Sequence, residues 1–380
     1  MFISRFYRFF YIMATGCFFY SCNLAKPFVY NLPDERDAKR FPYRTVNAAD
    51  SIFNFARSPV VLPEIMNIKV ESKPMNSVVV PLSEFVQLHK TTSFVLIRND
   101  SIVYEYYAKG YSNKTNVSSF SISKAYVTML TGIAINDGLI KSVNQPITDF
   151  ITEWKDKPGY SLITIKDLLR HTSGLKFRGG ILNPDSDQWQ FYYGTHLRKR
   201  ILSSKIREAP GLRFDYQSEN TCLLGLILER VTRKSLSAYL QEKIWSRIGT
   251  EAPALWNTDR EDSAAIEKAF CCLNARTLDF AKFARLLLNK GNWNGQQIIS
   301  AKWIAEATKR TNEGGGKLTY GYNMGLGPAE YESFYPTGLY GQWLYVYPEK
   351  KVIIVRFGKA NIKYNPNYWK QVMLQLADQL

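Results

Sequence analysis

Two pairs of β-type runs, one near residue 100 and one near residue 350, place the strongest constraint on how this 380-residue chain can fold. The first pair, 94–98 and 102–107, is rich in β-branched and aromatic residues and is joined by an Asn-Asp turn. The second pair, 342–347 and 352–357, flanks a Pro-Glu-Lys turn. An isolated hairpin is only marginally stable in water. We therefore expect both hairpins to join one antiparallel sheet, although they stand far apart in the sequence.

The chain between these hairpins has the apolar spacing of helices. The run 121–136 carries apolar residues at helical intervals and stops at Gly138. Thr164 and Asp167 resemble a capping box that opens a short helix. Five further ranges predict helices: 83–89, 219–230, 235–245, 277–288 and 368–376. The predicted fold class is α+β: an antiparallel sheet flanked by terminal helices, with a large, mainly helical insertion lobe.

The same patterns divide the chain into segments. Residues 1–22 are expected to be a signal or lipoprotein segment. Residues 23–81 have weak periodicity and scattered prolines, and they predict an extended N-terminal arm with little structure. Residues 82–380 predict the folded domain, with a sheet lobe at about 82–120 and 292–380 and a helical lobe at about 121–291. A cleft between two lobes is a common place for a binding pocket.

The N-terminus has the features of an export signal. Two arginines precede a short apolar run and small residues, which is typical of a secretory signal. A small residue directly before a cysteine resembles a bacterial lipoprotein signal, which implies a lipid on Cys22 or on Cys17. A simple cleaved signal or an uncleaved anchor remains open. We expect an exported protein that is attached to a membrane through an N-terminal lipid.

Charge and cysteine content exclude several classes. The net charge of +16 is spread along the chain, which indicates a solvated basic surface rather than a nucleic-acid partner. Of five cysteines, two lie in the N-terminal segment; the other three predict small buried thiols and no disulfide framework. The three histidines are scattered and form no HExxH motif, so no metal and no cofactor is expected.

A Ser-x-x-Lys pattern occurs twice, at Ser121-Lys124 and at Ser173-Lys176. Only Ser121 begins a long apolar helix; Ser173 lies where a turn is expected. Residues three apart share one helix face, so Lys124 can reach the Ser121 hydroxyl. The start of a helix also offers free N–H groups that can bind an oxyanion. A serine cap beside a surface lysine fits this pattern equally well.

Two later motifs could complete such a site. Tyr216 precedes the apolar helix at 219–230, where a tyrosine could relay a proton. Gly338 and Leu339 open the C-terminal strand, where a glycine lets a substrate approach the backbone closely. The Leu339 N–H could then be a second oxyanion donor. Taken alone, each motif is equally well explained as an ordinary loop or turn.

In this order, Ser-x-x-Lys, Tyr-x-Ser and Thr-Gly resemble the penicillin-recognising serine hydrolases, specifically the class C β-lactamase-like branch. The stretches 165–175 and 274–285 are also similar to that branch, and the resemblance runs from about residue 94 to 357. Within the branch, the motifs look most like those of the 6-aminohexanoate-oligomer hydrolases and related esterases.

The resemblance implies a role for each motif residue. Ser121 would be the nucleophile, Lys124 the base and Tyr216 a proton relay. The N–H groups of Ser121 and Leu339 would form the oxyanion hole, and Gly338 and Ser218 would contact the substrate. The implied reaction is hydrolysis of a small amide or ester through an acyl-enzyme, without a cofactor.

Two departures leave alternatives open. Pro336 stands where a β-lactamase has Lys or His, and Ser218 replaces the usual Asn. A β-lactamase or DD-peptidase-type enzyme is therefore disfavoured but not excluded, and so is a non-catalytic surface lipoprotein that binds a ligand or cell wall. A Ser-His-Asp triad is less favoured, since the chain has no Gly-x-Ser-x-Gly elbow and His171 is expected to be structural. Specificity is expected to lie in loops such as 179–193.

Overall fold

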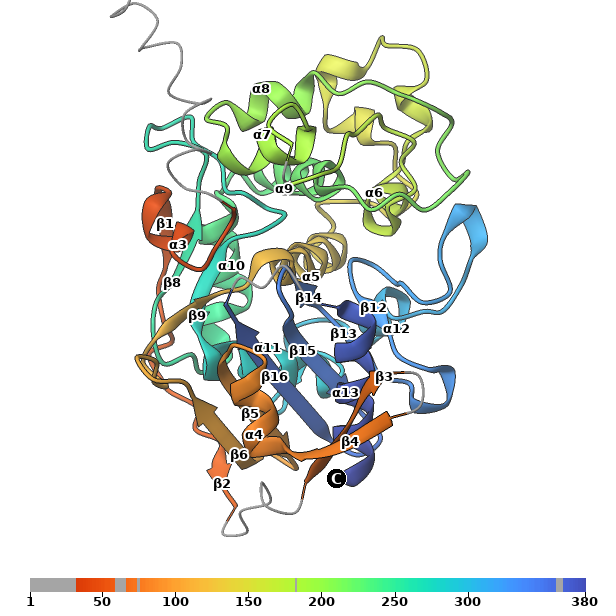
Figure 1. Ribbon diagram of the computed structural model, residues 1–380. Helices are drawn as coiled ribbons and strands as arrows, with labels where there is room; N and C mark the ends of the chain where they lie inside the picture. Colours follow the sequence, from red (N-terminus) through yellow and green to blue (C-terminus); the bar gives the residue numbers. More distant parts are fainter. Residues whose placement is uncertain (1–31, 59–65, 74–75, 182, 360–364) are drawn as a thin grey trace, which may run out of the picture.

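The computed structural model describes residues 32–58, 66–73, 76–181, 183–359 and 365–380. A large sheet forms one lobe and a group of helices forms the other, with α5 (Ser123–Asn136) lying between them (Figure 1). This arrangement confirms the predicted α+β class. The predicted signal segment, with Cys17 and Cys22, lies outside the described residues. Within the described residues, no helix combines the length and apolar character needed to cross a bilayer.

The main sheet has eight strands and contains both predicted hairpins. Strand β16 pairs antiparallel with β5, so the two hairpins meet as expected. All pairings in this sheet are antiparallel except that between β2 and β6, and β14 pairs with β15 at one side. In spatial order the strands are β12 (Gly325–Leu326), β13 (Phe334–Tyr335), β15 (Gln342–Tyr347), β16 (Val352–Gly358), β5 (Thr91–Arg98), β6 (Ser101–Tyr107) and β2 (Ala56–Arg57), with β14 at Thr337–Gly338.

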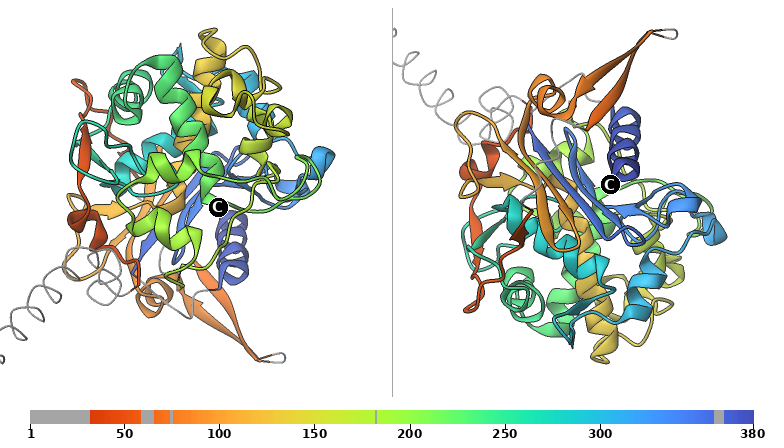
Figure 2. Two further views of the ribbon diagram at one scale, coloured as in Figure 1. Left: turned by 90° about the horizontal axis from the view of Figure 1, so that it is seen from above. Right: turned by 90° about the horizontal axis from the view of Figure 1, so that it is seen from below.

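Both faces of this sheet are covered. Along β5, Phe94 and Leu96 face a core shared with α4 (Leu82–Leu88) and α13 (Pro366–Gln379). Val95 and Ile97 face the opposite core, which includes α11 (Thr277–Leu288) and α5. Figure 2 shows the sheet from below, with α13 beside it. Burial on both faces explains why the central strands are continuously apolar instead of alternating with polar residues.

The structure contains each of the predicted helices: α4, α11 and α13 cover the main sheet, and those at 219–230 and 235–245 lie in the helical lobe. Thr164 caps α6 as expected: its side chain accepts from the Asp167 N–H, and the Asp167 carboxylate accepts from the Thr164 N–H. The other elements are η1 (Phe120–Ile122), η2 (Ile147–Asp149), η3 (Thr152–Trp154), η4 (Tyr160–Leu162), α6 (Ile165–Arg170), α7 (Asp187–Tyr193), α8 (Leu197–Leu202), α9 (Ser218–Thr232), α10 (Leu236–Lys243) and η5 (Trp245–Arg247). Between α11 and β12 lie β10 (Asn292–Trp293), β11 (Gln296–Gln297), α12 (Ala301–Ala307) and η6 (Glu313–Gly315), and η7 (Ala329–Tyr331) precedes β13.

A small second sheet supports the junction between the lobes. Its strand order is β1 (Tyr43–Val46), β8 (Ala254–Asn257), β9 (Leu273–Arg276) and β7 (Asn116–Ser118). Strand β7 runs directly into the turn that carries Ser121, and β9 pairs antiparallel with it. The small sheet therefore fixes the start of α5.

The prediction of a largely unstructured arm at 23–81 is wrong for the residues that the structure describes. These residues form α3 (Asp37–Arg40), β1, β2 and a hairpin of β3 (Asn67–Lys73) and β4 (Asn76–Pro81). Strand β1 pairs with β8, whose residues come much later in the chain. A four-residue strand with so distant a partner leaves no local periodicity, which is why the sequence did not reveal it.

Candidate active site

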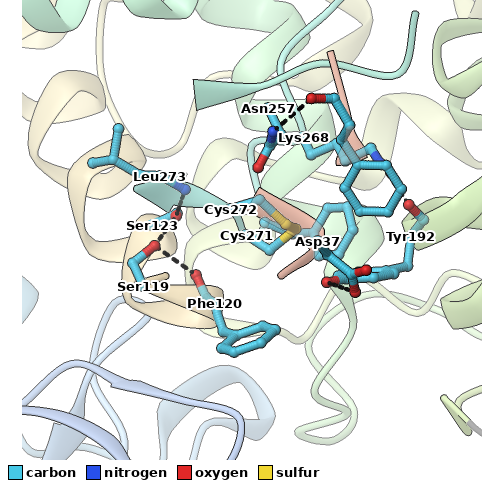
Figure 3. Close-up of a disulfide and its surroundings, with 12 residues drawn as sticks. Asp37, Ser119, Phe120, Ser123, Tyr192, Asn257, Lys268, Cys271, Cys272 and Leu273 are labelled. Carbon is cyan, nitrogen blue, oxygen red and sulfur yellow. Dashed lines mark hydrogen bonds between the residues drawn. A yellow bond between two sulfur atoms is a disulfide. The ribbon is translucent and has the colours of Figure 1, made fainter. Parts of the chain in front are cut away.

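Ser121 lies in the tight turn η1 between β7 and α5. The residue before it, Phe120, has a φ of +43°, which is uncommon for a bulky side chain and marks a constrained backbone. The turn is tied to β9: the Ser119 N–H donates to the Leu273 carbonyl at 3.0 Å, and the Leu273 N–H donates to Ser123 Oγ at 3.1 Å. Figure 3 shows the bond between Leu273 and Ser123. The position of Ser121 is therefore set by hydrogen bonds to β9 from the residues on both sides of it.

Lys124 is 1% exposed and lies under Ser121. Its Nζ donates to Ser121 Oγ and to the Phe270 carbonyl, each at 3.0 Å. The same Nζ is 4.9 Å from the centre of the Tyr216 ring. The structure thus brings together the serine, lysine and tyrosine that the sequence singled out. No ion pair found among the described residues includes Lys124.

A cavity of about 160 Å³ opens beside Ser121. Tyr216, Ser218 and Leu339, which the sequence proposed as site residues, are among the residues that line it. The remaining lining residues are Pro33, Phe120, Ile181, Gln188, Tyr192, Phe270 and Cys271. None of these side chains is charged. A larger cavity of about 660 Å³ is lined by parts of α11, α12 and β13, but none of Ser121, Lys124 and Tyr216 lines it, so volume alone does not mark the site.

Gly338 allows β14 to lie against the serine turn. A Cβ atom on this residue would be 2.3 Å from the Ser119 carbonyl oxygen and 3.1 Å from Phe120 Cβ. Any other residue would push β14 away, so glycine is required for this close approach. Leu339 follows directly and reaches the cavity. The pairing of the Ser121 and Leu339 N–H groups as an oxyanion hole stays a prediction.

Gln188 is a site residue that the sequence did not reveal. It lies on α7 and accepts a hydrogen bond of 2.6 Å from the buried Ser218 hydroxyl. No motif marks it; the only indication was that the loop 179–193 could set specificity. The hydrogen-bonded side chains of Gln188 and Ser218 form a polar wall in a cavity that is lined mainly by aromatic and aliphatic side chains.

His171 is fully buried beside the site. Burial is the main cause that lowers its pKa to about 3, so the imidazole stays neutral. Its Nδ1 accepts from the Gln217 N–H, and its Nε2 contacts Asn323 Oδ1 at 2.8 Å. These contacts hold the loop that carries Tyr216, which agrees with the structural role expected for His171.

The second Ser-x-x-Lys pattern forms no such pair. The Ser173 hydroxyl donates to Asn220 Oδ1 at 2.7 Å, and Lys176 is exposed. Among the described residues, no group of three or more His, Cys, Asp or Glu side chains is placed to hold a metal ion.

The expectation of free thiols is wrong for two cysteines. Cys271 and Cys272 form a disulfide between adjacent residues, whereas Cys222 is a free, buried thiol. Figure 3 places this disulfide next to the turn at Ser119 and Phe120. An odd number of cysteines, two of them adjacent, gave no disulfide framework in the sequence, and a bond between neighbouring cysteines has no spacing pattern that would reveal it.

Comparison with known proteins assigns the chain to a family. A family model described as beta-lactamase matches residues 87–371. The chain belongs to the beta-lactamase family. This family of serine hydrolases is the one that the sequence motifs resemble, and its match spans both lobes around Ser121.

Among the curated relatives of this beta-lactamase family member is a 6-aminohexanoate-dimer hydrolase from Paenarthrobacter ureafaciens, 23% identical over 226 residues. That match covers 56% of each chain, so the chain spans about half the length of this relative. Among solved structures, a candidate 6-aminohexanoate-dimer hydrolase from Bacillus anthracis is 24% identical with a TM-score of 0.78, covering 89% of this chain and 90% of the other. A family VIII carboxylesterase is 19% identical with a TM-score of 0.59, covering 78% and 94%. These structures share the fold.

Proposed function

We propose that this member of the beta-lactamase family hydrolyses an amide or ester bond through an acyl-enzyme on Ser121. The observation that carries the proposal is the 3.0 Å contact between Lys124 Nζ and Ser121 Oγ beside a cavity. This distance lies within the range over which a base takes a proton from a nucleophile.

In the proposed reaction, the amine form of Lys124 accepts the Ser121 proton as Oγ attacks the substrate carbonyl. The N–H groups of Ser121 and Leu339 stabilise the oxyanion. Tyr216, whose ring lies against Lys124, passes the proton to the leaving amine or alcohol. Water then releases the acyl group by the reverse path. No step requires a metal or a cofactor.

The lining of the cavity favours an uncharged substrate. None of its lining residues carries a charge, and the cationic residue that holds a β-lactam carboxylate in related enzymes is replaced by Pro336. A buried carboxylate without a partner is costly. We therefore propose a small, uncharged acyl group joined by an amide or ester bond, and we rank a β-lactam or DD-peptide substrate lower.

The experiment is covalent labelling with a fluorophosphonate, read by intact mass and peptide mapping. One adduct on Ser121 is expected, together with turnover of p-nitrophenyl esters or linear amide oligomers. Ser121→Ala should abolish both, and Lys124→Met should lower the rate by several orders of magnitude, because nucleophile and base act as a unit. Ser173→Ala, which changes the serine of the other Ser-x-x-Lys pattern, should still be labelled.

The outcomes separate the candidate functions. Labelling that survives in Ser121→Ala would refute the assignment of the nucleophile. A folded protein that takes no label and turns over no substrate would instead favour the non-catalytic ligand-binding or cell-wall-binding lipoprotein.

We also propose that the protein is exported and anchored by a lipid on Cys22, or on Cys17, as the N-terminal sequence suggests. Labelled palmitate should enter the full chain and be lost on substitution of one of these two cysteines. Incorporation that survives both substitutions would refute the lipid anchor.

A further inference from the structure

We propose that the Cys271–Cys272 disulfide is a redox-sensitive clamp that holds Lys124 and Ser121 in position, so that its reduction lowers the rate of acyl transfer. The inference rests on the proposed function of Ser121. It goes further by giving a task to a disulfide that the proposed reaction itself does not use.

The residues on either side of the disulfide form hydrogen bonds with the start of α5 and the turn before it. On one side, the Phe270 carbonyl accepts the 3.0 Å hydrogen bond from Lys124 Nζ. On the other side, Leu273 donates to Ser123 Oγ and accepts from the Ser119 N–H. The two cysteines are the only residues between these contacts. A change in their backbone therefore changes the spacing between the base and the serine turn.

The backbone at the disulfide is constrained. Cys272 has a φ of +72°, in the left-handed region that is unfavourable for a residue with a side chain. A bond between adjacent cysteines closes a ring across their peptide and so helps to hold this conformation. The same bond closes almost no chain loop, so it gains little of the loop-entropy stabilisation that long-range disulfides provide. Its main effect is local geometry.

Reduction should loosen this turn without unfolding the protein. The carbonyls of the pair remain bonded from outside: Cys271 O accepts from Trp256 Nε1, and Cys272 O accepts from the Asn257 N–H and from Asn274 Nδ2. Once the ring opens, Cys272 is free to relax toward a negative φ. We expect this to move the Phe270 carbonyl and Leu273 relative to α5.

The disulfide is reached through the active-site cavity. Both cysteines are almost fully buried, but Cys271 lines the cavity beside Ser121. A small dithiol can enter there: one of its thiolates attacks a protein sulfur, and the second closes the oxidised dithiol. Two electrons and two protons pass to Cys271 and Cys272. An acyl group on Ser121 should shield the disulfide from this reaction.

The test measures the rate constant for fluorophosphonate labelling of Ser121 before reduction, after dithiothreitol, and after reoxidation with glutathione disulfide. Alkylation and peptide mass identify the state of both cysteines at each stage. We expect the rate constant to fall at least tenfold on reduction and to recover on reoxidation, with little change in the thermal midpoint. Cys222→Ser should respond to reduction in the same way as the wild type.

Two double variants separate positioning from bulk stability. Cys271→Ala with Cys272→Gly keeps a residue that tolerates positive φ, whereas Cys271→Ala with Cys272→Ala does not. Neither should respond to dithiothreitol. The glycine version should retain more of the oxidised rate, through kcat rather than KM, and the alanine version should resemble the reduced enzyme.

Three results would overturn the clamp. They are alkylation of both cysteines before reduction, equal labelling rates in the two verified redox states, and an alanine variant as fast as the oxidised wild type. Failure of the proposed function looks different, because Ser121 would then take no label in either redox state.

Discussion

Glu219 offers the sharpest test of the electrostatics around the site, through the substitution Glu219→Gln. It follows Ser218 at the start of α9 and is 3% exposed. Burial raises the pKa of its carboxyl to about 8. The Ser204 hydroxyl contacts both Glu219 Oε1 and the Ile201 carbonyl, and its single hydrogen cannot serve both. A protonated Glu219 resolves this conflict, because it can donate to Ser204 while Ser204 donates to Ile201.

The magnitude follows from the two pKa values. In the unfolded chain the carboxyl ionises near 4.5, whereas in the folded protein it stays neutral up to about pH 8. Ionisation therefore stabilises the unfolded state as the pH rises. The free energy of unfolding falls by about 1.4 kcal/mol per pH unit across this window. Over the whole window the loss reaches roughly 5 kcal/mol. Glutamine has a similar shape and does not ionise, so the variant escapes this loss.

Urea denaturation at pH 5, 6, 7 and 8, followed by tryptophan fluorescence, checks this prediction. The free energy of unfolding of Glu219→Gln, minus that of the wild type, should rise steadily with pH. Contributions from other titrating groups, including His171, cancel in this difference. Glu261→Gln changes an exposed carboxyl and is the matched control. A difference for Glu219→Gln that stays constant with pH would show that Glu219 is ionised in the folded protein.

Three further predictions concern the cavity and its support. Gly338→Ala should lower kcat at least tenfold and destabilise the fold by roughly 1–3 kcal/mol, because its Cβ collides with the Ser119 carbonyl. Gly179→Ala, where no atom lies within 4 Å, should match the wild type in kinetics and denaturation. Gln188→Leu should raise KM roughly tenfold with a smaller effect on kcat, since it removes the polar wall and one hydrogen bond. Wild type should lose stability as the pH falls from 6.5 toward 3 because His171 resists protonation, and His171→Asn should lose about 1.4 kcal/mol less per pH unit in acid denaturation.

Local patterns in the sequence were sufficient for much of the fold. The hairpins near residues 100 and 350 and the capping box at Thr164 depend on neighbouring residues, and the structure contains each of them. Strand β1 depends on a partner distant in sequence, so its local pattern was uninformative. That the two hairpins share one sheet could be inferred only from the weakness of isolated hairpins, and the sequence did not show which strands pair, β16 with β5.

The candidate site divides in the same way. Ser121 and Lys124 could be placed together because helical spacing fixes their relation, and the 3.0 Å contact agrees with that. Gln188 could not be found, because its position depends on how α7 packs against Ser218. The bond between Cys271 and Cys272 accompanies a left-handed backbone at Cys272. Glycine often marks such a backbone in a sequence, but a cysteine does not.

The close approach of β14 to the serine turn also determines where substrate range can change. On that side the wall is backbone, and the space that a side chain at Gly338 would need is already occupied. The helical lobe contributes the side chains of Ile181, Gln188 and Tyr192 to the lining of the cavity. New specificities should therefore arise on the helical side of the cavity, and a mutant library that varies these three positions would explore them while leaving the machinery around Ser121 intact.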